Sequence, residues 1–222
     1  MMNCHKPPAD RSFGRWFVFL VLLLSFAGSA RGQIFTDWTS VDTTNRIASG
    51  TLGSTSVTFT GTSAGDIYFS WLDGNYTGFS IAAFTPSLVT SDALEFRGYP
   101  SSPTYTVTFG VPVFNPILHI ATLASILTFS GATPHSISSD NLWSVSGNQV
   151  FGYDGATLNA NGTIQFLGEY SSLSFTAYYS GAWDGIDLHV GATAVPEPAA
   201  SAALLGATAL GLVVAWHRRR RV

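Results

Sequence analysis

The middle of the chain alternates apolar and polar residues with a period of two. The pattern is clearest in four segments, residues 56–60, 104–109, 172–179 and 186–190. In each of them, aliphatic or aromatic residues hold every second position, and most positions between them carry hydroxyl or charged side chains. Because successive side chains of a β-strand point to opposite faces, this pattern predicts half-buried strands. One buried face and one solvated face are typical of antiparallel sheets.

Turn signals separate these segments. They are Asp73-Gly74-Asn75, Gly147-Asn148, Asp154-Gly155, Asn161-Gly162 and Asp184-Gly185. Such residues tolerate the positive φ that tight hairpins require. About a dozen short strands at this spacing predict an all-β fold, an antiparallel β-sandwich with a jelly-roll-like strand order, over residues 33–194.

The stretch of residues 115–127 fits two descriptions. Asn115 and Pro116 could cap and begin a helix, since proline is favoured at the first helical position. The β-branched residues that follow, and the β pattern on both sides, favour a buried strand with a turn. The strand is the preferred prediction.

The N-terminal segment, residues 1–32, is predicted to be a signal peptide. Lys6, Arg11 and Arg15 precede an apolar run over residues 17–27, and small residues follow it. This order of positive, apolar and small residues is typical of secretory signals. Cleavage after Ala30 and cleavage after Gly32 fit equally well. An uncleaved anchor is the alternative, but the run is shorter than the ~20 residues that span a bilayer.

The C-terminal segment, residues 195–222, has three parts in a fixed order. Val195-Pro196-Glu197-Pro198 is stiff because each proline fixes φ. The uncharged residues 199–216 are numerous enough for a transmembrane helix, which is predicted there. His217 and the cluster Arg218, Arg219, Arg220 and Arg221 end the segment. Arginines after a span hold that end in the cytoplasm, so the body would face outward.

This segment resembles the PEP-CTERM sorting signal of Gram-negative, exopolysaccharide-producing bacteria. The resemblance is carried by Pro196-Glu197-Pro198, the apolar run and the arginine cluster, in that order. It implies that an exosortase, a membrane-embedded transpeptidase or protease, cuts at or near Pro196-Glu197-Pro198. An inner-membrane-anchored intermediate would then give a protein on the cell surface, in the extracellular matrix or in the medium. An ordinary single-span anchor is the alternative.

Charge and cysteine content narrow the function further. Charged residues make up 10% of the 222-residue chain, against about 25% in an average soluble domain. Between Gln33 and Val195 the only basic residues are Arg46 and Arg97, whereas eleven residues are acidic. An acidic body argues against nucleic-acid binding, and the lack of lysine there excludes the usual phosphate-binding loop. The single cysteine, Cys4, lies in the signal segment, so the body has no disulfide.

No catalytic motif stands out, and the expectation is that the body is not an enzyme. Ser63 lies in a G-x-S-x-G match, but a strand and not a helix is expected after it, so it is predicted to be a loop residue. His119 is expected in the core and His189 on the solvent side of its strand. Calcium binding is the alternative role for two pairs of acids, Asp184 with Asp187 and Asp66 with Asp73. The preferred interpretation is that these acids solubilise the domain and cap turns.

The body is rich in aromatic residues, which leaves a second function open. They are Trp38, Trp71, Trp143 and Trp183, with Tyr76, Tyr99, Tyr153, Tyr178 and Tyr179. Most are expected in the core, but exposed rings can stack on sugars. The first hypothesis is therefore a structural or adhesive protein of the surface or matrix. The alternative is a carbohydrate-binding module acting on exopolysaccharide, and a secreted hydrolase is less favoured.

Overall fold

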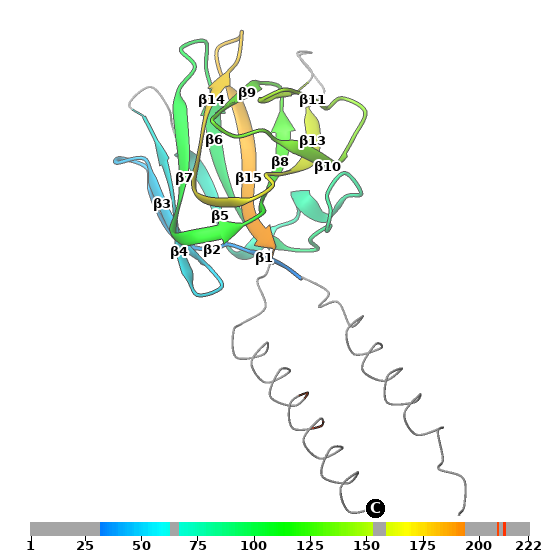
Figure 1. Ribbon diagram of the computed structural model, residues 1–222. Helices are drawn as coiled ribbons and strands as arrows, with labels where there is room; N and C mark the ends of the chain where they lie inside the picture. Colours follow the sequence, from blue (N-terminus) through cyan, green and yellow to red (C-terminus); the bar gives the residue numbers. More distant parts are fainter. Residues whose placement is uncertain (1–31, 63–66, 153–158, 194–207, 209–210, 212–222) are drawn as a thin grey trace, which may run out of the picture. The chain divides into compact units, whose positions relative to one another are not determined.

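The computed structural model describes residues 32–62, 67–152, 159–193, 208 and 211 (Figure 1). Several sequence predictions fall outside these residues. They are the signal peptide up to Arg31 with its Ala30 cleavage point, Ser63, Asp66, the motif 195–198, most of the apolar run and the arginine cluster. Among the residues that the structure describes, no helix combines the length and apolar character needed to cross a membrane.

The described strands form two sheets in which every strand pairing is antiparallel. The first has the order β10 (His135–Ser139), β13 (Ala160–Gln165), β8 (Pro116–Leu123), β15 (Asp184–Thr193), β6 (Ser91–Gly98) and β5 (Ile67–Tyr76), and β1 (Gln33–Phe35) also pairs with β15. The second has the order β11 (Ser144–Ser146), β12 (Gln149–Phe151), β9 (Ile126–Ser130), β14 (Glu169–Tyr178), β7 (Thr104–Phe114), β4 (Thr55–Gly61), β3 (Ile47–Leu52) and β2 (Asp37–Asp42). The predicted all-β, antiparallel two-sheet architecture is confirmed.

The ambiguous stretch of residues 115–127 forms strands joined by a turn. It forms β8 and the start of β9, which belong to different sheets. Asn115 has a φ of 49°, which the chain adopts between β7 and β8. The preferred prediction of a strand and a turn is therefore confirmed, and the helix is excluded. β8 is buried between β13 and β15, which explains why its sequence is apolar on both faces.

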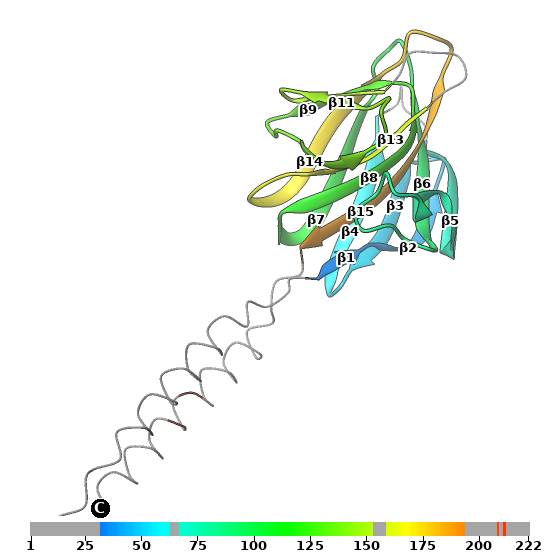
Figure 2. The same ribbon diagram turned by 90° about the vertical axis from the view of Figure 1, so that its right-hand side faces the viewer.

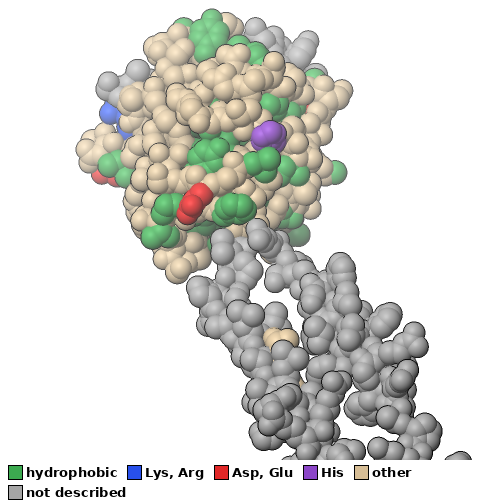
Figure 3. All heavy atoms as spheres, in the orientation of Figure 1, with side chains coloured by type: hydrophobic (Ala, Val, Ile, Leu, Met, Phe, Trp, Pro, Cys, Tyr) green, Lys and Arg blue, Asp and Glu red, His purple; other side chains and the backbone are tan. Residues whose placement is uncertain are grey.

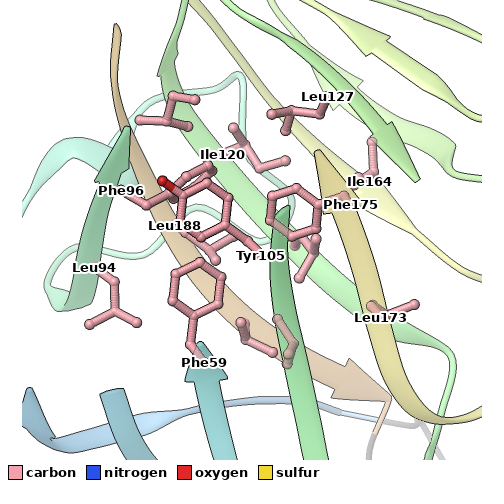
Figure 4. Packing of buried hydrophobic residues seen from close by; sticks show 14 of the residues in the cluster. Phe59, Leu94, Phe96, Tyr105, Ile120, Leu127, Ile164, Leu173, Phe175 and Leu188 are labelled. Atoms are coloured by element: carbon pink, nitrogen blue, oxygen red, sulfur yellow. The ribbon is translucent and has the colours of Figure 1, made fainter. Parts of the chain in front are cut away.

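The main core lies between the two sheets and is rich in aromatic rings. Figure 4 shows Phe59, Phe96 and Tyr105 turned toward one another there, and all three are fully buried. The rings of Phe59 and Tyr105 stack with centroids 5.5 Å apart. The Tyr105 hydroxyl donates a 2.6 Å hydrogen bond to the Arg97 carbonyl, so its polar end is satisfied inside the core.

A second, smaller core covers part of the outer face of the β8–β15–β6–β5 sheet. Ala93 and Ala121 alternate with residues of the main core along their strands, so they face outward. The segment between β5 and β6, which includes the 3₁₀ turn η1 (Gly78–Ser80), packs Phe79 and Phe84 onto them. The outer face of this sheet is thus partly closed to solvent.

This cover corrects the prediction for His189. His189 does lie on the outer face of β15, as the period of two predicts, but it is only 3% exposed. The rings of Phe35 and Phe79 lie against it, with centroids 5.1 and 5.9 Å away. The prediction of a solvent-facing His189 was wrong because the covering segment lies far away in the sequence. His119 is fully buried, as predicted.

The two described ends of the β domain lie side by side. Gln33, in the first strand, is the register partner of Thr193, the last residue of β15. Figures 1 and 2 show β1 and the arrowhead of β15 together at one end of the domain. The segments that precede and follow the β domain therefore join it at the same place.

Candidate ligand-binding site

Charged side chains of β6 and β15 lie near an exposed tryptophan, Trp183, which directly precedes β15. Figure 3 shows one face of the domain, on which charged side chains are sparse and hydrophobic ones are scattered. We use the name β6–β15 cluster for a set of five side chains, which are Glu95, Arg97, Trp183, Asp184 and Asp187. Thr193 is at the other end of β15, nine residues beyond Asp184 and six beyond Asp187, so about 20–30 Å of extended chain separates the cluster from the ends of the domain.

Strand register places the charged residues side by side. Asp187 is the register partner of Glu95, and Gly185 is the partner of Arg97. Partners in an antiparallel pair have Cα atoms about 4.5–5.5 Å apart and side chains on the same face. The outward face of β6 and β15 thus carries two carboxylates directly opposite each other, which is an unfavourable arrangement unless something compensates for it.

Asp187 is held from the side that faces the protein. Its Oδ2 accepts a 2.7 Å hydrogen bond from the Tyr76 hydroxyl and lies 3.2 Å from the Thr122 hydroxyl. Thr122 has a φ of 59°, and its hydroxyl also lies 2.9 Å from the Gly185 carbonyl. These contacts hold the Asp187 side chain, which is 5% exposed, beside its register partner, the half-buried Glu95.

Asp184 caps the turn between β8 and β9. Its Oδ2 accepts hydrogen bonds from the Ala124 amide at 2.9 Å and from the Ser125 hydroxyl at 2.6 Å. The Asp184 side chain is buried, so it contributes its charge to the cluster but little surface that a ligand could contact. Asp184 is therefore a structural residue at the edge of the site.

The carboxylates disfavour one another's ionisation. Burial raises the pKa of Asp187 to about 6, with Glu95 and Asp184 adding to the rise. Burial likewise raises the pKa of Asp184 to about 6, against the effect of its hydrogen bonds. The pKa of Glu95 is raised by burial and lowered in part by Arg97. Neighbouring carboxyl groups with raised pKa values are a feature of functional sites.

Trp183 gives the cluster an exposed aromatic surface. Its side chain is 51% exposed, and the guanidinium carbon of Arg97 lies 4.3 Å from its ring centroid. A Cβ atom on Gly185 would lie 3.0 Å from Oε1 of Glu95 and 3.5 Å from Cζ3 of Trp183. The glycine therefore leaves the space in which the carboxylate and the ring lie near each other. An exposed ring beside a carboxylate can contact both the apolar face and the hydroxyls of a sugar.

Of the other candidate residues, the structure brings together His119 and His189, which are register partners on β8 and β15. His119 and His189 are buried, and His135 is exposed on β10. Within the described ranges, no three or more His, Cys, Asp or Glu residues form a group that could hold a metal ion. Of the candidate calcium pair Asp66 and Asp73, Asp66 lies outside the described residues.

Sequence reasoning found part of this cluster. Asp184 and Asp187 were considered for calcium and Trp183 for sugar stacking, but Glu95 and Arg97 were missed. The signal was present, since Ala93, Glu95 and Arg97 hold alternate positions of one strand. What the sequence could not give was the register that places Glu95 opposite Asp187.

The comparisons with known proteins add no family to this description. No protein-family model matches the chain, and neither the curated proteins nor the solved structures gave a match.

Proposed function

We propose that the protein is exported and acts on the cell surface or in the extracellular matrix through a non-enzymatic, structural or adhesive β-sandwich. Secretion machinery would recognise residues 1–32. An exosortase would recognise Val195-Pro196-Glu197-Pro198, the predicted transmembrane helix 199–216 and Arg218–Arg221, and would cleave the chain there. The membrane would hold the intermediate until that cleavage.

The position of the domain ends carries this proposal. Gln33 pairs with Thr193, so both processing segments join the sandwich at one end. The described strands of the two sheets all lie between Gln33 and Thr193. Removal of both segments would thus leave the hydrogen bonds of the sheets intact, as a secreted product requires.

A jelly-roll-like strand order remains part of the proposal. Consecutive strands β6, β7 and β8 alternate between the sheets, as do β13, β14 and β15. Alternation of this kind is what two interlocked Greek keys would give. This alternation supports the proposed order.

The intact mass of the protein purified from its native host tests the sorting proposal. We expect the mass of a chain that begins after Ala30 or Gly32 and ends near Pro198. Any excess mass would report an attached lipid or glycan. A mass that extends to Val222 would overturn the cleavage step and would favour a retained anchor. A chain that still contains residues 1–32 would overturn the signal peptide.

The β6–β15 cluster favours a second candidate, a carbohydrate-binding module acting on exopolysaccharide. The specific observation is the half-exposed ring of Trp183 beside the carboxylate of Glu95. A panel of matrix polysaccharides, titrated against intrinsic tryptophan fluorescence, tests this function. A shift that disappears in Trp183→Ala is expected, and no shift across the panel would exclude the carbohydrate-binding function.

A further inference from the structure

We infer that the β6–β15 cluster binds sugar units that carry an ammonium group in preference to uronic acids. This inference rests on the proposed carbohydrate-binding function and names the class of sugar. It stands on the placement of one exposed ring, one accessible carboxylate and the charges around them.

The ring of Trp183 supplies the contact surface. It is among the most exposed large apolar side chains of the described residues, with half of its surface open to solvent. Arg97 lies over the ring at 4.3 Å, which orients the indole by a cation–π contact. A ring that is held in place loses little conformational entropy when a flat sugar face stacks on it.

Glu95 supplies the polar contact next to the ring. It is half-buried, and its carboxylate and the indole both lie above Gly185. Its register partner Asp187 already accepts hydrogen bonds from the hydroxyls of Tyr76 and Thr122. Glu95 is therefore the carboxylate of this pair that is open to a ligand. A sugar stacked on Trp183 would place its ring substituents within reach of Glu95.

The charge of the cluster decides between classes of sugar. Glu95 and Asp187 lie opposite each other on the outer face, Asp184 adds a third carboxylate at the start of β15, and Arg97 is the one guanidinium of the cluster. The other basic residue between Gln33 and Thr193, Arg46, lies just before β3 in the other sheet. An ammonium group beside Glu95 would complete a charge-assisted hydrogen bond and offset the repulsion between the carboxylates. A uronate in the same place would add a fourth negative charge.

The experiment uses the processed protein from its host and three matched tetrasaccharides. They are made of glucosamine, N-acetylglucosamine and galacturonic acid, and binding is measured by calorimetry at about pH 6.5. We expect the glucosamine tetramer to bind about fivefold more tightly than the acetylated one, and galacturonate to bind most weakly. The preference for glucosamine should shrink when salt rises from about 50 mM to about 500 mM.

Two variants and a control separate the possible results. Glu95→Gln keeps the size of the side chain, so it should abolish the preference for glucosamine and leave binding of the acetylated tetramer within about twofold. Trp183→Ala should weaken both by about tenfold or more. Tyr178→Ala, which removes an exposed aromatic ring from the other sheet, should change neither.

Two outcomes would overturn the inference in different ways. Binding of the acetylated tetramer with no gain for glucosamine, or tightest binding of galacturonate, would refute the charge preference while the carbohydrate-binding function stands. No binding of any tetramer or matrix polysaccharide would refute both together.

Discussion

His119 and His189 are register partners on the adjacent strands β8 and β15, and both imidazole rings are buried. The Phe35 ring contacts both of them, with centroids 4.8 Å from His119 and 5.1 Å from His189. Nδ1 of His119 lies 2.9 Å from the Thr163 hydroxyl, and Nε2 of His189 donates to the Thr36 carbonyl at 3.0 Å. Two neighbouring imidazoles in an apolar cover are stable only when uncharged.

Acid should therefore destabilise the sandwich through this pair. Burial lowers the pKa of His119 to about 3 and that of His189 to about 4, below the ordinary 6.5. As the pH falls, the two imidazoles are protonated in the unfolded chain before they are protonated in the fold. The stability that the neutral pair contributes is therefore complete above about pH 6.5 and is lost as the pH falls toward 4. For His189 the loss is at most about 3 kcal/mol. Asp184 and Asp187 act in the opposite direction as the pH falls through 6, because their raised pKa values favour protonation in the fold.

Urea unfolding of His189→Gln at a series of pH values isolates the histidine contribution. Its free energy of unfolding should fall less steeply between about pH 6.5 and pH 4 than that of the natural protein. His135→Gln is the matched control, since His135 is exposed on β10 and should leave the slope unchanged. Equal slopes for all three proteins would contradict the assignment of the pH dependence to the buried pair.

Asp92 connects the two sheets and should be costly to remove. Its Oδ2 accepts a hydrogen bond from the Trp38 amide on β2 and its Oδ1 accepts one from the Gly74 amide on β5, both at 2.7 Å. Asp92→Ala leaves two amides without their acceptor, so we expect the free energy of unfolding to fall by about 2–4 kcal/mol. Asp42→Ala, which removes an exposed acceptor from a turn, should cost much less. Similar losses in urea unfolding for both variants would show that Asp92 has no special bridging role.

Gly162 allows β13 to pass beneath Trp143. A Cβ atom there would lie 2.8 Å from the indole ring and 3.1 Å from the Ser138 carbonyl. Gly162→Ala should therefore lower the free energy of unfolding by about 1–3 kcal/mol, because the ring or the strand must shift. The same change in a Trp143→Leu background should cost less, since the obstructing ring is absent. An undiminished cost in that double variant would place the strain elsewhere, at the Ser138 carbonyl.

Glu95→Gln should raise the melting temperature at neutral and alkaline pH. Burial raises the pKa of Glu95, so its ionised form is less stable in the fold than in the unfolded chain. A carboxyl group with a raised pKa contributes stability at low pH, and this contribution disappears as the pH rises through the pKa of the folded state. The gain in melting temperature from Glu95→Gln should therefore vanish in acid. Calorimetric melts at several pH values, with Glu169→Gln on the exposed face of β14 as the control, measure the effect. A lower melting temperature for Glu95→Gln at neutral pH would mean that its pairing with Arg97 dominates.

The strands were predictable where one face alone is buried. β4, β7 and β14 coincide with segments of alternating pattern, because side chains on a half-covered strand must alternate. β15 also alternates in sequence, although a distant segment covers its outer face as well. β8 was ambiguous from sequence because both of its faces are buried, and an apolar run of that kind has no period that separates strand from helix.

The candidate site was less accessible to sequence reasoning because it depends on distant pairings. Glu95 and Asp187 are 92 positions apart, and only the register of β6 against β15 joins them. The error for His189 has the same origin, since a covering segment more than 100 positions earlier buries it. A local pattern shows which face of a strand a residue occupies and says nothing of what lies on that face.

The extent of β15 has a mechanical consequence. This one strand begins at the β6–β15 cluster and ends where the chain leaves the domain at Thr193, so a force between a captured ligand and a tethered C-terminus would run along its length. β6 and β8 flank it with antiparallel hydrogen bonds, which lie perpendicular to the strand and to such a pull. The bonds would be loaded in shear and would have to break together, whereas a strand pulled from one end across its bonds opens them one at a time. The arrangement would suit a domain that keeps hold of a ligand under flow, as the proposed carbohydrate-binding function requires.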